Sequence, residues 1–166
     1  MDAIRLDAPC AGEGILALHA GDRVLLSGTV YTARDAAHRR MVELLGRGEE
    51  LPFRLEGAAI YYCGPAPAPP GRVIGAGGPT TSGRMDAYAP LLIERGLRLM
   101  IGKGPRSAAV LEAMRAHGAA YLAAAGGAGA LLASCITECE LVAWPELGPE
   151  AVRRLTVKDM PLTVAA

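Results

Sequence analysis

The chain has 166 residues, of which 51% are hydrophobic and 20% are charged, so it can bury a core and does not have the composition of a disordered chain. Lys and Arg together number 17 and Asp and Glu also number 17, and the resulting net charge of zero excludes a generally basic nucleic-acid binder. One Phe, one Trp and five Tyr are too few and too scattered to form base-stacking platforms. A local cationic patch remains compatible with this composition.

The N-terminal segment MDAIRLDAPC lacks the basic start and the apolar run of a signal peptide. No stretch reaches the roughly 18 uninterrupted apolar residues of a membrane span. The cysteines, which show no C-x-x-C spacing, are Cys10, Cys63, Cys135 and Cys139. Cys135 and Cys139 lie in a strand-like segment, where they would be roughly 13 Å apart and too distant for a shared metal or a disulfide. We therefore expect reduced, structural thiols in a cytoplasmic protein.

Strand and helix signals alternate in the first half of the chain. Asp22–Tyr31 is rich in Val, Leu and Thr, which predicts a strand. Asp35–Leu45 follows with apolar residues at helical spacing, which predicts a helix with Gly46 as its C-cap. Ala58–Tyr62 and Arg72–Ile74 predict two short strands on either side of a turn-rich stretch of prolines and glycines.

The second half begins with a glycine-rich loop, Gly75–Asp86, and a helix that ends at Gly96 and that Pro90 kinks or splits. The remaining elements are expected, in chain order, as a strand at Leu97–Ile101, a helix at Ser107–His117 that stops at Gly118, a strand at Ala119–Ala123, a short helix over 126–133, and strands at Ile136–Ala143 and Val152–Val157. Because the chain shows neither an internal repeat nor a linker, we predict one mixed α/β domain over residues 1–166.

The glycine-rich loop carries the densest functional signal. Its glycines permit positive φ and the close approach of a ligand, and the start of the following helix suits a phosphate or a carboxylate. Thr80, Thr81 and Ser82 supply hydroxyl groups, and Arg84 supplies a cation. An ordinary strand–loop–helix turn is the alternative interpretation. A nucleotide-binding loop is disfavoured because GAGGPT departs from the G-x-G-x-x-G pattern.

Two further segments place cations at predicted strand ends, where open α/β sheets bind ligands. In Thr32–His38, Arg34 has the geometry for a bidentate bond to a carboxylate. We expect Asp35 to cap the following helix and His38 to be a structural histidine rather than a base. Lys103 stands between two glycines, which suits an anion, although a plain surface lysine is the simpler interpretation.

Three motifs together resemble one known family. GPTTSGRMD at 78–86, TARDAAH at 32–38 and IGKG at 101–104 are similar to the class I, iron–sulfur-dependent fumarase and L-tartrate dehydratase family. Specifically, the chain resembles the C-terminal domain or the separate β subunit of these hydro-lyases. The similarity extends from GDRVLLSG to the closing segment ELGPEAVRRLTVKDMPLTV. Small departures are Met160, where the family usually has phenylalanine, and a shorter tail.

The resemblance implies a swivelling β/β/α fold that covers the active site of an α subunit or N-terminal domain. In that family the partner half holds a 4Fe-4S cluster through three cysteines. This chain has no candidate cysteine triad and begins at its own Met1, so we expect a separately encoded β subunit that is active only with its α subunit and binds no metal itself. The apolar surface meant for that partner would favour self-association of the isolated chain.

The reaction that the resemblance implies is the reversible addition or removal of water on a C4 dicarboxylate, which converts fumarate to malate by addition or tartrate to oxaloacetate by removal. Thr80 is then the catalytic base, and Arg84 and Lys103 favour its alkoxide form and stabilise developing negative charge. The substrate-binding residues implied in the same way are Arg34, Thr81 and Ser82. The alternative function is a stand-alone small-anion-binding module with the same fold and no catalysis, and a purely structural homo-oligomer comes third.

Overall fold

The computed structural model describes residues 3–10, 12–75, 78–124 and 129–166. Its strands are β1 (Ile4–Ala8), β2 (Arg23–Thr32), β3 (Ala59–Tyr61), β4 (Leu99–Gly102), β5 (Ala120–Ala123), β6 (Ile136–Ala143) and β7 (Val152–Val164). Its α-helices are α1 (Gly12–Leu16), α2 (Asp35–Gly46), α3 (Ala89–Glu94), α4 (Ala108–His117) and α5 (Gly129–Ser134). Two 3-10 helices complete the set, η1 (Ser82–Met85) and η2 (Pro145–Glu150).

The seven strands form one mixed sheet in the order β1-β2-β3-β4-β5-β7-β6. Strands β1 to β5 pair in parallel with their neighbours, whereas β7 runs antiparallel to β5 and β6. The long strand β7 also pairs with β2, from Arg23 opposite Thr163 to Thr32 opposite Arg153. The pairings β2–β3, β3–β4, β4–β5, β5–β7 and β7–β2 therefore form a closed ring of strands. Outside this ring, β1 pairs with β2 and β6 pairs with β7. The expected single mixed α/β domain is confirmed, and the swivelling type remains a prediction.

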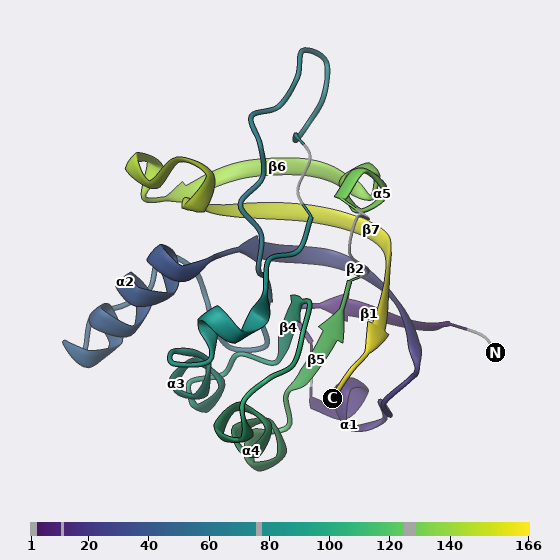
Figure 1. Cartoon of the computed structure of the whole chain (residues 1–166), viewed down its shortest axis with the longest axis vertical. Coiled ribbons are helices and arrows are strands. Elements are labelled where there is room, and N and C mark those ends of the chain that lie inside the picture. The colour runs from purple at the N-terminus through teal and green to yellow at the C-terminus, as the bar shows by residue number, and fades with distance from the viewer. Residues whose placement is uncertain (1–2, 11, 76–77, 125–128) are drawn as a thin grey trace.

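Alternation along the strands separates two apolar cores. In β4, Leu99 and Ile101 belong to a cluster that gathers side chains from all seven strands, whereas Met100 belongs to a second cluster. That second cluster lies against α2, α3 and α4 and includes Met41 and Leu92. Figure 1 shows these three helices together on one side of the sheet, while the chain between β3 and η1 extends in the opposite direction past β6 and β7. The helix side and the strand ends beside it position the candidate site.

The strongest local signals are confirmed. Helix α4 begins after Ser107, whose Oγ accepts from Val110 N at 3.3 Å, and ends at Gly118, whose φ of 75° suits glycine. The expected kink or split at Pro90 is wrong, because α3 begins at Ala89 and this proline occupies its first turn, where its missing N–H costs no hydrogen bond. Strand β6 has the expected bounds, Ile136–Ala143.

Several expectations were wrong. Arg72–Ile74 forms bends rather than a strand, because this short run among prolines finds no pairing partner. Helix α2 continues through Gly46, its C-cap is Arg47, and Asp35 is its first residue rather than its N-cap. The cap is Arg34, with no side-chain bond, and Glu150 accepts from the free N–H of Ala36 instead.

Two parts of the fold have elements that the sequence patterns did not predict. Strand β1 and helix α1 precede the first predicted strand, and β7 continues seven residues beyond the expected Val157. This continuation contains Asp159 at a φ of 49° and Pro161, which obscure the strand pattern. The short helix expected over 126–133 appears as α5, and its start at 126–128 lies outside the described residues. Across the described ranges, no helix is both long enough and apolar enough to cross a membrane.

Candidate active site

The predicted site segments meet at one edge of the sheet. Strands β2, β3 and β4 are parallel, so their carboxyl ends lie at the same edge. Arg34 follows the end of β2 by two residues, and Lys103 follows β4 directly. The hydroxyl-rich segment of the glycine-rich loop, Thr80–Arg84, reaches the same edge from the other end of the long connection after β3.

Backbone hydrogen bonds fasten Thr80–Arg84 onto the strand ends. Thr80 N donates to the carbonyl of Tyr62 at 2.8 Å, Ser82 N donates to the carbonyl of Lys103 at 2.9 Å, and Thr81 and Lys103 form a parallel β-bridge. The close approach requires a glycine at 102, because a Cβ there would overlap the Ser82 hydroxyl and meet the Tyr62 ring at 2.8 Å. The hydroxyl segment and Lys103 are therefore direct neighbours.

The side chains of this segment point to different surroundings. Arg84, Thr81 and Lys103 are exposed, and Thr80 is half-buried. Ser82 is completely buried, and its Oγ lies 2.7 Å from the hydroxyl of Tyr121. Because the Tyr121 hydroxyl donates to the carbonyl of Gly104 at 2.8 Å, the Ser82 hydroxyl must donate to Tyr121. This position supports a role for Ser82 in holding the turn rather than in contacting a ligand.

Arg34 lies beside the chain that leaves β3. A Cβ added to Gly64 would stand 3.1 Å from Arg34 Cδ and 3.2 Å from its Nη1, so the guanidinium packs against a bare stretch of backbone. Its Nε is buried and has no hydrogen-bond partner in the described part of the chain. An unsatisfied buried donor of this kind costs about 1–3 kcal/mol, which an anionic ligand at this point would recover.

His38, four residues further along α2, is completely buried. Its Nδ1 lies 2.8 Å from the Arg34 carbonyl, which can only accept, so Nδ1 carries the proton and Nε2 is an acceptor without a partner among the described residues. Burial lowers the pKa of His38 to about 4, although the hydrogen bond that His38 donates to the Arg34 carbonyl raises it, and the charge of Arg106 lowers it further. A neutral imidazole that supports the backbone of Arg34 agrees with the expected structural role.

The three cations at this edge are not neutralised. Arg34, Arg84 and Lys103 take part in no ion pair within the described ranges, whereas Arg39, Arg40, Arg47 and several other arginines do. Unpaired cations close to hydroxyl groups match the charge of a small dianion, and guanidinium groups offer paired donors to carboxylates. The edge therefore carries local positive charge and hydroxyl groups although the whole chain has no net charge.

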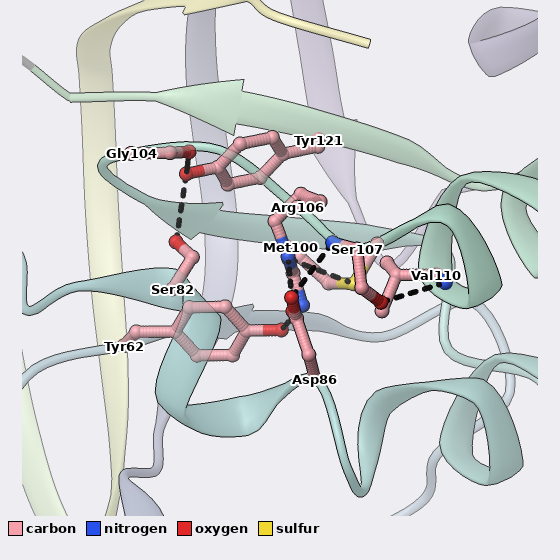
Figure 2. A network of polar contacts seen from close by, with 9 residues as sticks. All are labelled: Tyr62, Ser82, Asp86, Met100, Gly104, Arg106, Ser107, Val110 and Tyr121. Atoms are coloured by element: carbon pink, nitrogen blue, oxygen red, sulfur yellow. Dashed lines mark hydrogen bonds and ion pairs between the residues drawn. The ribbon is translucent and has the colours of Figure 1, made fainter.

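A buried polar network behind the edge was missed by the sequence patterns (Figure 2). Arg106 Nε lies 2.8 Å from Asp86 Oδ1, and Arg106 Nη2 donates to the Tyr62 hydroxyl at 3.1 Å. The same hydroxyl network includes Tyr121, whose ring centroid is 4.9 Å from the guanidinium of Arg106. The signal was in the sequence, because Asp86 closes the GPTTSGRMD motif and Arg106 follows Lys103 by three residues.

The cysteines of this chain do not fit an iron–sulfur cluster. No three Cys, His, Asp or Glu residues gather in metal-binding geometry among the residues that the structure describes. Burial raises the pKa of Cys63 to about 12 and that of Cys10 to about 11, which disfavours the thiolate that binds iron. All four thiols are free. The four cysteines therefore do not form a ligand set for a cluster within the described residues.

Comparison with known proteins gives a consistent result. The family model described as "Fumarase C-terminus" matches residues 1–166. The chain is 45% identical over 141 residues to the anaerobic class I fumarate hydratase of Escherichia coli K12 and 44% identical over 143 residues to fumarate hydratase 2 of Leishmania major. These alignments cover 84% and 85% of this chain but 26% and 25% of the relatives, so the chain spans about a quarter of their length.

A relative of similar size is also found. The chain is 40% identical over 154 residues to a Methanocaldococcus jannaschii protein named "Putative L(+)-tartrate dehydratase subunit beta", and the alignment covers 89% of this chain and 79% of that protein. The relatives thus carry both of the names to which the three motifs pointed, and the family match includes every segment at the candidate edge. The chain belongs to the fumarase C-terminus family.

Proposed function

We propose that this chain is the β half of a hydro-lyase that reversibly adds water to a C4 dicarboxylate, either fumarate or the dehydration product of tartrate. Three cations at one sheet edge, Arg34, Arg84 and Lys103, carry this proposal, because they take part in no ion pair with any described residue and lie at the same edge as the half-buried Thr80 and the exposed Thr81. The similarity to a protein named as a β subunit supports a separate α partner, and the similarity to fumarate hydratases supports the reaction class.

In the proposed reaction, this chain supplies the base and the anion-binding groups. Removal of a C–H proton next to a carboxylate needs a base and stabilisation of the charge that develops on that carboxylate. Thr80 takes the proton, and the exposed cations of Arg84 and Lys103 favour its alkoxide form and bind the developing charge. Arg34 and Thr81 hold the far carboxylate. Ser82 holds the backbone of the turn, because its hydroxyl is buried.

The 4Fe-4S cluster that the family resemblance implies is assigned to the α partner in this proposal. The described cysteines of this chain do not gather at one point. The sheet edge that carries Thr81, Arg84 and Lys103, in contrast, is exposed to solvent and so is open to a partner. The complete site then requires both halves, and we expect the isolated chain to be inactive. The choice between the fumarate/malate and the tartrate/oxaloacetate pair depends on groups from both halves in this proposal, because malate and tartrate differ by only one hydroxyl.

Reconstitution tests the proposal. The chain is co-expressed with its α subunit without oxygen, and hydration and dehydration are measured with fumarate, malate, tartrate and oxaloacetate. We expect activity with one of these pairs, and Thr80→Ala should lower kcat by about 100-fold or more, the size of a general-base contribution, with unchanged assembly. The matched control is Thr137→Ala on strand β6, which removes a hydroxyl that donates to the Thr156 carbonyl and should keep wild-type kcat.

The outcomes separate the candidate functions. A cluster-containing complex that is inactive with all four acids contradicts the hydro-lyase proposal. If the isolated chain also binds a dicarboxylate tightly in calorimetry, the anion-binding module takes its place. Activity that persists in Thr80→Ala removes Thr80 from the role of base while leaving the reaction class intact.

A further inference from the structure

We propose that Arg106 is a positioning residue for the reaction: its buried ion pair with Asp86 sets Lys103 in register with the hydroxyl segment Thr80–Arg84. This inference rests on the proposed function, because it assigns a role in the same site. Neither Arg106 nor Asp86 faces the substrate edge with a free polar group, so both act through other residues rather than on the reacting atoms.

The ion pair joins the two segments at their far ends. The Arg106 side chain is only 1% exposed and that of Asp86 is 16% exposed, and their Nε and Oδ1 atoms are 2.8 Å apart. The second carboxylate oxygen of Asp86 accepts from the backbone N–H of Ser107 at 2.7 Å. One carboxylate at the end of the hydroxyl segment therefore binds both the side chain and the backbone of the segment that follows Lys103.

The near ends of the segments are joined independently by backbone contacts. Thr81 and Lys103 form a β-bridge, and Ser82 N donates to the Lys103 carbonyl. Arg84 thus lies between the near contact at Ser82 and the far contact at Asp86, and Lys103 is itself the near contact on its segment. The Asp86–Arg106 pair lies on the far side of Arg84 from these contacts and, together with the buried Ser82 and Met85, opposes rotation of the segments about the bridge.

The guanidinium of Arg106 also contacts two tyrosines beside the hydroxyl segment, Tyr62 and Tyr121. It lies 5.1 Å from the ring centroid of Tyr62 and 4.9 Å from that of Tyr121, and its Nη2 donates to the Tyr62 hydroxyl. The Tyr62 carbonyl in turn accepts from Thr80 N, and the Tyr121 hydroxyl joins Ser82 to Gly104 (Figure 2). Arg106 is thus linked through two tyrosines to the start and the middle of the hydroxyl segment and to the turn after Lys103.

Burying the Asp86–Arg106 ion pair adds little to the stability of the fold by itself. Desolvation offsets much of the Coulomb attraction of a buried ion pair, and apolar residues of similar volume often stabilise a fold as well. Apolar side chains do not fix the orientation of their neighbours, whereas the planar guanidinium of Arg106 binds several partners at defined angles. A lysine ammonium cannot reproduce these angles. The geometry therefore supports a role in alignment, where a displacement of 1 Å costs on the order of 100-fold in rate.

Arg106→Lys tests the inference by two measurements. The first is amide hydrogen exchange of the full chain, in which the N–H groups of Ser82 and Ser107 should exchange at least about tenfold faster while those of the β2–β7 ladder keep their protection. The second is steady-state kinetics of the complex with its α subunit. We expect kcat to fall by about 10- to 100-fold and KM to rise by about fivefold or more, because the substrate contact of Lys103 is misaligned as well.

The KM of the Arg106→Lys complex distinguishes a misaligned site from a partly unfolded protein. A variant that merely unfolds part of the population lowers kcat in proportion to the active fraction and leaves KM unchanged, and this result would overturn the inference. Unchanged exchange at Ser82 and Ser107 would overturn it too. Asp86→Asn, which keeps the volume and an acceptor for Ser107, provides a milder second variant and should shift both readouts in the same direction if Arg106→Lys does not fold.

Arg98→Lys is the matched control. Arg98 is a second partly buried arginine, but its Nη1 donates to the carbonyls of Ile93 and Leu97, away from the site segments. It should leave KM and the exchange of the Ser82 amide unchanged, and an equal effect from both arginines would contradict a specific role. If the wild-type complex is active and the Arg106→Lys complex has the same kcat and KM, the positioning role is refuted but the proposed function is not. If the wild-type complex is inactive, the proposed function is refuted.

Discussion

The buried neutral His38 predicts a defined acid sensitivity of this fold. The imidazole has no exposed surface, and its Nδ1–H donates to the Arg34 carbonyl at 2.8 Å. Burial is the largest cause that lowers the pKa of His38, from 6.5 to about 4, and the charge of Arg106 acts in the same direction. In the unfolded chain the imidazole is hydrated and regains its ordinary pKa, so the two states bind different numbers of protons between these values.

The sign and size of the effect follow from this difference. Between pH 6.5 and pH 4 the unfolded state binds the proton and the folded state does not, so stability rises with pH in this window. A difference of about 2.5 pKa units corresponds to about 3 kcal/mol of unfolding free energy. This contribution is fully present above about pH 7, is lost progressively as the pH falls, and becomes constant below the folded pKa of His38 near 4.

Urea unfolding of the wild-type chain and of His38→Asn at pH 7, 6, 5 and 4 measures the effect. Asparagine places an amide donor close to the position of Nδ1 but does not titrate, so the difference between the two proteins isolates the proton from all carboxylates. The advantage of wild type over His38→Asn should shrink by about 3 kcal/mol from pH 7 to pH 4. His19→Asn is the control, because that side chain is 84% exposed. A pH-independent difference for His38 would refute the assignment of a buried neutral imidazole.

Three glycine and serine substitutions test the local geometry. Gly102→Ala should destabilise the chain by about 1–3 kcal/mol in urea unfolding, because a Cβ overlaps the Ser82 hydroxyl in a packed core; wild-type stability would mean that this turn is packed more loosely. Ser107→Ala should cost about 1 kcal/mol through the lost cap of α4, with KM of the complex unchanged. Gly64→Ala should displace the guanidinium of Arg34 and raise KM several-fold with little change in unfolding midpoint, and an unchanged KM would argue against that cation as a substrate ligand.

Local sequence patterns predicted the elements whose start, apolar face and end are all marked by residues within the same short segment. Helix α4 has a serine cap, a regular apolar face and the terminal Gly118, all within twelve residues. Strand β7 shows the opposite case, because its second half contains Asp159 and Pro161 and is a strand only through pairing with β2 and, near its end, β5. Pairing partners distant in sequence decide such segments, and periodicity within one segment carries no information about them.

The candidate site shows the same division. The chemistry-bearing residues of the motifs were identifiable from residue type, and the structure brings Thr80, Thr81 and Lys103 together by backbone contacts. Residue type could not show that the Ser82 hydroxyl is buried against Tyr121 while its neighbours are exposed. That distinction depends on the 3-10 turn at η1, where a single residue step rotates a side chain from solvent to core.

The two faces of this turn bear on how the active site would be assembled. Ser82 and Met85 are buried and fix the segment to the core, while Arg84 between them projects into solvent. These anchors all belong to this chain, so the backbone that carries the cations and hydroxyl groups is already held in place before any partner binds. We therefore expect an α subunit to meet a preformed half-site, with little ordering cost, since rigid groups lose less conformational freedom on association. Order in the isolated chain at η1 and at Lys103 would then match that in the complex, and amide exchange in the two states can compare them directly.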